Sequence, residues 1–346
     1  MRKELALWAR INRFPLFVVF ELTPYCNLRC PMCYVRLDPV RAAKQGKMMT
    51  GKQWLEIARQ ARDMGALFVT LTGGEPFMHP DFWEIYEGIL ELGLLPNIFT
   101  NGCLINEDVV ERLKKNPPHN IKMSIYGASN ETYEAMCGIK DGYTKICRAI
   151  DLLKEAGLEF FCTSTVVKEN RQDLAAMYTM AREKQINFFH TIAVVNSTRD
   201  ALSDPLNSRL PHTEAAWTLE RMEREKRRDR YMDKPFVACG GYTTTFHMTW
   251  HGHMQFCGFA PTPCARVVEP FDVKRAWEEL MELTERITTP EECATCPHYE
   301  FCKRCPGLLA AESGDPSKIC PSFCKQAEEL HALYERLKEE AASAED

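Results

Sequence analysis

Short apolar runs alternate with longer amphipathic segments between residues 16 and 195. Runs rich in β-branched and aromatic residues are typical of strands, whereas apolar residues at helical spacing are typical of helices. The runs predict six strands, at residues 16–22, 66–71, 95–99, 121–125, 158–167 and 188–195. The segments between them predict one helix with Thr50 as its N-cap and further helices at residues 82–92, 107–115, 142–156 and 172–184.

The order of these elements predicts an α/β fold with a parallel sheet. The predicted strands are apolar on both faces, as is usual where helices cover both sides of a parallel sheet. Six strand–helix units are too few to close an eight-stranded barrel.

Polar or glycine-rich residues follow four of the predicted strands. They are the cysteine-rich stretch at 26–34, the tetrapeptide Gly73-Gly74-Glu75-Pro76, the tripeptide Thr100-Asn101-Gly102, and Ser124. Because parallel strands end at the same edge of a sheet, we expect these residues to form one pocket.

Composition narrows the class of protein. The 346 residues are 45% hydrophobic and 26% charged with a net charge of −5, which is ordinary for a soluble globular protein of two domains. The charge argues against nucleic acid as a partner. The sequence shows no signal-peptide pattern and no apolar stretch of membrane-spanning length, so we expect a cytoplasmic protein without a membrane partner.

Sixteen cysteines in such a chain indicate metal ligation, because structural disulfides are uncommon in a reducing compartment. Three of them lie within residues 26–33, and nine follow residue 238. The other four are scattered, and we interpret them as small buried apolar side chains: Cys103, Cys137, Cys147 and Cys162.

The spacing Cys26-x3-Cys30-x2-Cys33 suits a cubane iron–sulfur cluster. Such clusters take four ligands, usually thiolates, so three close thiolates hold three irons and leave the fourth open to a small molecule. For these cysteines alone, a zinc site that lacks its fourth ligand is the alternative.

Together with Gly73-Gly74-Glu75-Pro76, the cysteine motif resembles that of the radical S-adenosylmethionine (SAM) enzymes, and the resemblance covers residues 12–330. It implies a partial (β/α)6 TIM-like barrel with one [4Fe–4S] cluster and SAM as cofactors. It also implies reductive cleavage of SAM to a 5′-deoxyadenosyl radical that abstracts hydrogen from a substrate. A protein such as flavodoxin or ferredoxin would donate the electron.

The same resemblance gives the residues at the strand ends roles in SAM binding. Gly73 and Gly74 would let the backbone approach the methionine moiety, and Glu75 would offer a carboxylate to its ammonium group. Pro76 would stiffen the turn. Further SAM contacts would come from Tyr34, Asn101 and Ser124.

Residues 242–250 and 253–257 alternate Thr and aromatic residues around the pair His251-Gly252, which predicts a β-hairpin. We expect the hairpin histidines, His247, His251 and His253, at the surface or in the turn.

The nine cysteines of the tail resemble the SPASM extension of the radical SAM superfamily, which implies a smaller cysteine-rich domain with two auxiliary [4Fe–4S] clusters. One ligand set would be Cys293, Cys296, Cys302 and Cys324. The other would be Cys239, Cys257 and Cys305, with Cys264, Cys320 or an open site in the fourth position. The gap between Cys302 and Cys305 is one residue shorter than usual. A zinc ribbon is the alternative, although nine cysteines exceed one zinc site.

The break in alternation after residue 195 and the resemblance together divide the chain. We expect a radical SAM core at residues 12–200, a linker with a charged helix at 201–234, a SPASM domain at 235–330, and a helix end with a tail at 331–346.

The resemblance implies oxidative modification of a ribosomal peptide, such as a crosslink, an epimerisation or a dehydrogenation. Cys103 at the third strand end is a candidate hydrogen donor. Only 25 residues precede Cys26, too few for a leader-binding domain, so we expect a separate protein to present the precursor peptide, or else a small-molecule substrate. A non-catalytic iron–sulfur electron carrier or zinc scaffold is the alternative from another class, but it leaves Gly73–Pro76 unexplained.

Overall fold

The computed structural model describes the chain except residues 1, 198, 212–238, 240–241, 303–304 and 345–346. The charged helix predicted around residues 220–228 therefore lies outside the described residues. None of the described helices has the length and apolarity that crossing a membrane requires.

Six parallel strands form the centre of the fold and neighbour one another in chain order, as the sequence predicts. They are β1 (Phe17–Glu21), β2 (Phe68–Thr72), β3 (Leu95–Thr100), β4 (Asn120–Ser124), β5 (Phe160–Thr165) and β6 (Phe188–Thr191). The last strand is shorter than predicted, because Val194 and Val195 leave the sheet and line a cavity instead. The expected partial (β/α)6 barrel is confirmed.

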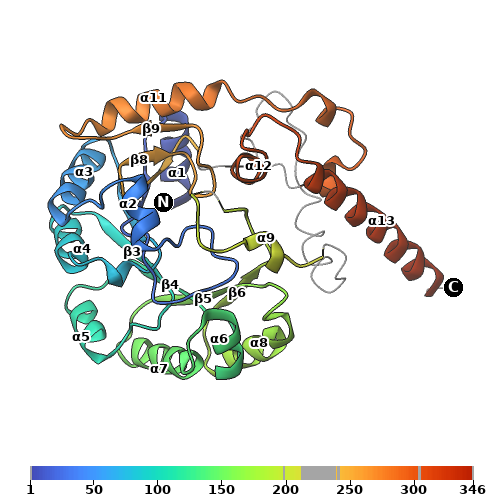
Figure 1. Ribbon diagram of the computed structural model, residues 1–346, viewed down its shortest axis with the longest axis horizontal. Helices are drawn as coiled ribbons and strands as arrows, with labels where there is room; N and C mark the ends of the chain where they lie inside the picture. The colour runs from blue at the N-terminus through green and yellow to red at the C-terminus, as the bar shows by residue number, and fades with distance from the viewer. Residues whose placement is uncertain (1, 198, 212–238, 240–241, 303–304, 345–346) are drawn as a thin grey trace.

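Helices form an outer arc around these strands (Figure 1). The arc contains α3 (Gly51–Asp63), α4 (Phe82–Glu91), α5 (Glu107–Lys115), α6 (Asn130–Cys137), α7 (Gly142–Glu155) and α8 (Leu174–Glu183). Thr50 caps α3 as predicted, since its hydroxyl accepts from Gln53 N and the Gln53 side chain accepts from Thr50 N. The sequence analysis did not predict α6, and it also missed α1 (Arg2–Asn12), α2 (Pro39–Gln45) and α9 (Pro205–Ser208). Single 3-10 turns occur at η1 (Pro76–Met78) and η2 (Arg171–Asp173).

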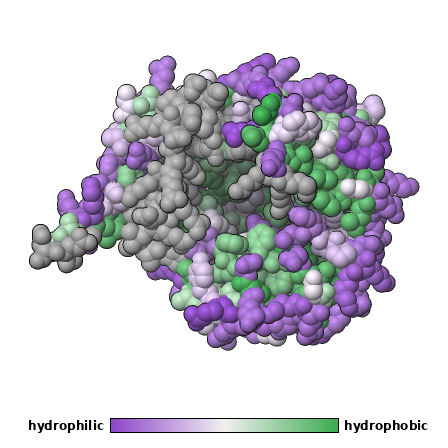
Figure 2. All heavy atoms as spheres, turned by 180° about the vertical axis from the view of Figure 1, so that it is seen from behind, coloured by the Kyte–Doolittle hydropathy of each residue, from purple (hydrophilic) through white to green (hydrophobic). Residues whose placement is uncertain are grey.

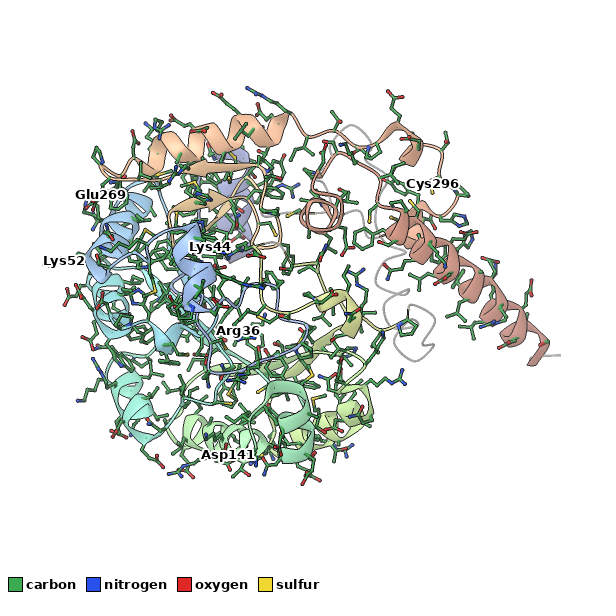
Figure 3. The ribbon with its side chains drawn as sticks, viewed as in Figure 1. Arg36, Lys44, Lys52, Asp141, Glu269 and Cys296 are labelled. Atoms are coloured by element: carbon green, nitrogen blue, oxygen red, sulfur yellow. The ribbon has the colours of Figure 1, made fainter. Side chains whose placement is uncertain are left out.

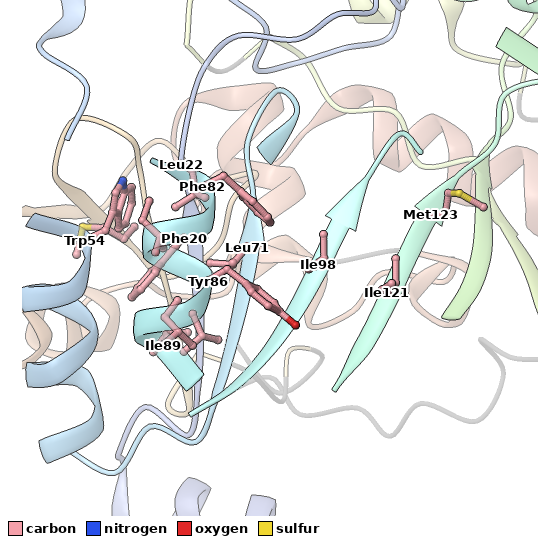
Figure 4. Close-up of a cluster of buried hydrophobic side chains, with 14 of the residues drawn as sticks. Phe20, Leu22, Trp54, Leu71, Phe82, Tyr86, Ile89, Ile98, Ile121 and Met123 are labelled. Atoms are coloured by element: carbon pink, nitrogen blue, oxygen red, sulfur yellow. The ribbon is translucent and has the colours of Figure 1, made fainter. Parts of the chain in front are cut away.

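The core lies between the sheet and the arc of helices. Phe20, Leu71, Ile98 and Ile121 are paired in register across β1 to β4, and all four are buried. They pack toward side chains of α3 and α4, such as Trp54 and Tyr86, as the close-up shows (Figure 4).

The opposite face of the strands differs from the prediction. In β3 and β4, buried residues alternate with half-buried ones, and Lys122 and Ser124 are among the half-buried ones. The strands are therefore not apolar on both faces. One face packs on the helices, and the other faces the inside of the partial barrel.

The predicted hairpin is present as β7 (Thr245–Met248) and β8 (His253–Gln255), and β9 (Cys264–Arg266) pairs with β8. The sequence analysis did not predict that β7 pairs in parallel with β1, which extends the central sheet to nine strands. The expected surface position is wrong for His247, which is 8% exposed because β7 lies between β1 and β8. The domain boundaries stay a prediction.

The remaining tail lies to one side of the partial barrel (Figure 1). Helix α11 (Val273–Glu285) packs on β8 and β9, whereas α12 (Pro306–Ser313) and α13 (Pro321–Ala344) lie farther out, and α13 projects away from the body. Two 3-10 turns, η3 (Glu291–Cys293) and η4 (Tyr299–Phe301), precede α12. A largely buried ion pair between Arg209 and Glu312 ties the segment after α9 to α12.

A second ion pair joins the end of β1 to the segment after β6. The side chains of Arg199 and Glu21 form this pair and are only 6% and 3% exposed. Arg199 Nη2 also donates to the carbonyl of Gly258, at 2.8 Å. Because buried charges are costly unless paired, this contact fixes β1, the linker and the turn after Cys257 in one arrangement.

We expect Arg199→Met to lower the free energy of unfolding by about 3–5 kcal/mol, because it leaves the Glu21 carboxylate buried without its partner. The double variant Arg199→Met/Glu21→Met should recover much of this loss. The measurement is denaturant unfolding of the metal-free protein.

Lys145→Met is the matched control, since it breaks the pair with Asp141, whose side chains are 43% and 58% exposed. This variant should lose less than about 1 kcal/mol. Equal losses for Arg199→Met and Lys145→Met would contradict the role of the buried pair.

Candidate functional site

A cavity of about 380 Å³ opens at the carboxyl ends of the parallel strands. Eight of the residues predicted to bind a cluster or SAM line it together: Cys26, Cys30, Cys33, Tyr34, Gly73, Gly74, Asn101 and Ser124. The structure thus brings together residues that are up to 98 positions apart in the sequence (Cys26 to Ser124). Seen from behind, the molecule is hollowed and hydrophobic residues lie in the hollow (Figure 2).

The three cysteines of the opening motif lie on the loop that follows β1. The amide of Asn101 donates toward Cys26 Sγ at 3.6 Å and to Asn27 Oδ1 at 2.8 Å, so the end of β3 steadies this loop. Cys30 Sγ lies 3.5 Å from Cys137 Sγ at the end of α6. Cys137 is buried as predicted, and its carbonyl also accepts from Arg29 N.

The surroundings of these thiols favour the neutral form in the absence of metal. The hydrogen bond with Cys137 and burial raise the pKa of Cys30, and burial raises the pKa of Cys26 and of Cys33. Arg36 opposes the rise for Cys30 and Cys33, and it lies inside the arc of helices (Figure 3). Because metal ligation requires thiolates, an iron cluster would supply the positive charge that these sites otherwise lack.

The residue types around Cys26, Cys30 and Cys33 suit an iron–sulfur cluster, but the three thiols are not already arranged as its ligands. Three thiols and an amide donor line one cavity, and the Arg36 guanidinium lies near the thiols outside that lining. Within the described residues, however, no three Cys, His, Asp or Glu side chains lie close enough together to hold a metal ion.

Gly73 and Gly74 bring the end of β2 against the loop that leads to Cys26. Gly74 N donates to Thr23 O at 2.7 Å, and Glu75 N donates to Tyr25 O at 2.8 Å. A Cβ atom would lie 2.5 Å from Thr23 O at Gly73, where φ is +153°, and 2.2 Å from Tyr25 O at Gly74. Both positions therefore require glycine, quite apart from any approach to SAM.

The Glu75 carboxyl group lies beneath the cavity wall and is not among the residues that line it. It accepts from Thr100 Oγ1 and from Asn101 N, both at 2.8 Å, and so joins the end of β2 to the end of β3. Burial raises its pKa to about 7, although these hydrogen bonds oppose the rise. Pro76 is also buried and does not line the cavity. Both residues therefore support the cavity wall from behind, and their contact with SAM stays a prediction.

Cys103 follows the same strand end but does not line the cavity. The residue is 8% exposed, and its backbone N donates to Asn101 Oδ1 at 3.0 Å. Its role as a hydrogen donor stays a prediction. Of the other scattered cysteines, Cys162 is buried as expected, whereas Cys147 is only half-buried.

Sequence reasoning missed several residues on the inner face of β4 to β6. Lys122, Thr165 and Thr191 line the cavity, and so does Tyr126, just after β4. The signal that could have found Lys122 is its position two residues before Ser124, which puts both side chains on the same face of a strand.

The tail cysteines lie in two groups. Cys239 and Cys305 lie near Cys257 and add to the effect of burial, which raises the pKa of Cys257 to about 12. A small separate pocket is lined by Cys293, Cys302, Cys320 and Cys324. Burial raises the pKa of Cys324, and the nearby Cys296 raises it further. Cys296 lies beside the start of α13 (Figure 3).

The two cysteines expected as alternative fourth ligands, Cys264 and Cys320, lie in different places, and their role as ligands stays a prediction. Cys320 shares the pocket of Cys293, Cys302 and Cys324, so it lies with the second group. Cys264 is the first residue of β9 and pairs with Gln255 of β8. Burial raises the pKa of Cys264, Glu279 raises it further, and Arg266 opposes the rise.

Comparison with known proteins identifies one domain. Residues 20–181 match the model of the radical SAM superfamily. The chain carries a radical SAM domain. This superfamily implies SAM and one [4Fe–4S] cluster as cofactors.

Two curated relatives span most of this chain. An AdoMet-dependent heme synthase of Methanosarcina barkeri is 24% identical over 337 residues, which cover 87% of this chain and 94% of the relative. A PqqA peptide cyclase of Granulibacter bethesdensis is 27% identical over 311 residues, which cover 83% of this chain and 81% of the relative.

Solved structures share the fold. SuiB of Streptococcus suis bound to the precursor peptide SuiA has a TM-score of 0.66 at 20% identity and covers 93% of this chain and 79% of its own. The enzyme anSMEcpe with bound AdoMet and a peptide has a TM-score of 0.65 at 16% identity and covers 95% of this chain and 99% of its own. The fold predicted from the cysteine motif and the tail is confirmed.

We expect Gly74→Ala to weaken SAM binding and to lower the free energy of unfolding by about 1–3 kcal/mol, because the new methyl group would collide with Tyr25 O. Binding of SAM to the reconstituted protein, without reductant, is the measurement, together with the iron content.

Gly93→Ala is the control. Its φ is +77° and no atom lies within 4 Å of the position that the new methyl group would take, so it tests backbone strain alone. It should bind SAM like the wild type. Wild-type SAM affinity in Gly74→Ala would show that the close approach is dispensable.

Proposed function

We propose that this protein is a radical SAM enzyme that oxidatively modifies a residue of a peptide substrate. The observation that carries the proposal is the arrangement of one cavity. Its wall runs from the three cysteines and Gly73-Gly74 to β4–β6, and it includes Phe259, two residues after Cys257. A substrate in this cavity would lie between the SAM end and the first group of tail cysteines.

When bound, a reduced [4Fe–4S] cluster supplies the electron that breaks the sulfonium bond of SAM, and the resulting 5′-deoxyadenosyl radical takes hydrogen from carbon. Cys26, Cys30 and Cys33 would hold that cluster. The amide of Asn101 would steady Cys26, and the backbone at Gly73 and Gly74 would meet the methionine moiety.

Further residues of the lining would orient SAM and keep water out. Ser124 would contact SAM from β4, and Tyr34 would meet its adenine. Apolar side chains of the lining, Leu28 and Met32, are buried beside the cysteines and would exclude water from the radical.

The peptide class of substrate rests on the relatives. A PqqA peptide cyclase is among the curated matches, and SuiB and anSMEcpe were solved with bound peptides. A crosslink, an epimerisation or a dehydrogenation would each begin with hydrogen abstraction in this cavity. A separate peptide-presenting protein, an electron donor such as flavodoxin or ferredoxin, and a cytoplasmic location belong to the same proposal.

The two cysteine groups of the tail support two auxiliary clusters. We assign Cys239, Cys257 and Cys305 to one cluster, and Cys293, Cys296, Cys302 and Cys324 to the other. Either cluster would take up an electron from the substrate, which favours a net oxidation. Cys320 lines the same pocket as Cys293, Cys302 and Cys324, which supports it as a further candidate ligand of the second cluster.

A small-molecule substrate is the second candidate. The heme synthase matches along 94% of its own length, which is more than the share matched in the peptide cyclase. The radical SAM domain favours either enzyme over a non-catalytic electron carrier.

Anaerobic wild-type protein with SAM and dithionite should release 5′-deoxyadenosine, measured by mass spectrometry. Cys30→Ala should release none above background, because the cluster would lose one of three ligands. Cys147→Ala, which alters a half-buried cysteine on α7 outside the cavity, should behave as the wild type. Release by Cys30→Ala at the wild-type rate would refute the assigned motif.

Iron analysis tests the auxiliary clusters independently. Three cubanes would give about twelve irons per chain after reconstitution, and Cys26→Ala/Cys30→Ala/Cys33→Ala should keep about eight of them. Zinc in place of this residual iron, or no residual metal, would leave the tail without its proposed clusters.

A further inference from the structure

Lys122 is distinctive among the residues that line the cavity. Of the described lining residues it alone carries a charged side chain of the Lys, Arg, His, Asp or Glu type. The others offer hydroxyls, one amide, thiols, apolar groups or backbone. A ligand that enters this cavity therefore meets one fixed positive charge.

The ammonium group of Lys122 has no carboxylate partner within the described part of the chain. Its Nζ lies 4.6 Å from the centre of the Phe99 ring, which is its register neighbour on β3. Burial lowers the pKa of Lys122, as expected for a cation removed from water. Two other cations that are largely buried differ, because Arg199 pairs with Glu21 and Arg209 pairs with Glu312.

The location of Lys122 separates it from the cluster and from the SAM end of the cavity. Arg36, and not Lys122, is the cation that affects Cys30 and Cys33. Lys122 precedes Ser124 by two residues on β4, which sets it roughly 6–7 Å farther from the rim on the same face. In register, Lys122 pairs with Phe161, so Thr165 and its β6 partner Thr191 lie nearer the rim than Lys122 does.

We propose that Lys122 binds a carboxylate of the substrate, so that the enzyme selects a peptide with an acidic side chain near the residue that it modifies. This inference rests on the proposed function. A carboxylate would give the half-buried ammonium its missing counter-charge through a charge-assisted hydrogen bond. A neutral amide of the same shape would leave the charge of Lys122 uncompensated.

The test is equilibrium retention of peptide pools on SAM-loaded enzyme without reductant, read by mass spectrometry. Each pool fixes one central residue, Glu, Gln or Lys, between degenerate flanking positions. The wild type should retain the Glu pool about tenfold more than the Gln pool, as expected for a charge-assisted contact. Lys122→Met should remove this difference, Lys122→Arg should keep it, and Lys122→Glu should favour the Lys pool.

Lys52→Met is the matched control. Lys52 is exposed on α3 at the outside of the molecule, so this variant should keep the wild-type preference for the Glu pool (Figure 3). SAM affinity is measured in parallel, because the carboxylate of SAM is the other source of the same chemistry. In Lys122→Met we expect it to stay close to the wild-type value.

Equal retention of the Glu and Gln pools by the wild type, including no retention of either, would overturn the proposal. So would a loss of SAM affinity in Lys122→Met with the Glu preference intact, which would assign Lys122 to SAM. Because no turnover is involved, these results are distinct from failure of the proposed function, which would show as no 5′-deoxyadenosine from the wild type.

Discussion

The close approach of two backbone segments is the constraint on which the site depends. The parallel register of β1 and β2 pairs Glu21 with Thr72, so the residues just beyond both strands must run side by side. There, Gly74 N bonds to Thr23 O, with no room for a side chain on either glycine. This contact sets where the loop to Cys26 begins. The positions of the three thiols, and hence of any cluster, follow from it.

Strand β1 also positions the hairpin that leads to the tail cysteines. It lies between β2 and β7, so the hairpin that leads to Cys257 is part of the sheet that positions Cys26. At its end, Glu21 reaches Arg199, which in turn holds the carbonyl of Gly258. The two cysteine regions therefore share one rigid strand end. A cavity lined by both Cys30 and Phe259 is the consequence.

Local signals and long-range contacts were not equally predictable from the sequence. The bounds of α5 and the cap of α3 follow from residues within one or two turns, and both agree with the structure. The pairing of β7 with β1 joins residues more than 200 positions apart, and no local pattern encodes it. The hydrogen bonds of Glu75 with Thr100 and Asn101 were not predicted, because a motif gives residue type and spacing but not the direction of a side chain. Lys122 was missed because β4 has only five residues, and one Lys among them is too weak a pattern to show that the inner face of the strand is polar.

The distribution of charge in the cavity bears on how a radical reaction can be selective. A carbon-centred radical takes the hydrogen atom that is nearest and best aligned, so selectivity must come from where the substrate is held. Polar anchors at a distance from the reacting carbon can do this without offering the radical a competing hydrogen. In this cavity Lys122 lies two residues before Ser124 on β4, while the cysteines lie on the loop that follows β1. Under the two proposals, anchoring and chemistry would occupy different parts of the cavity, and the distance between them would determine which carbon reacts.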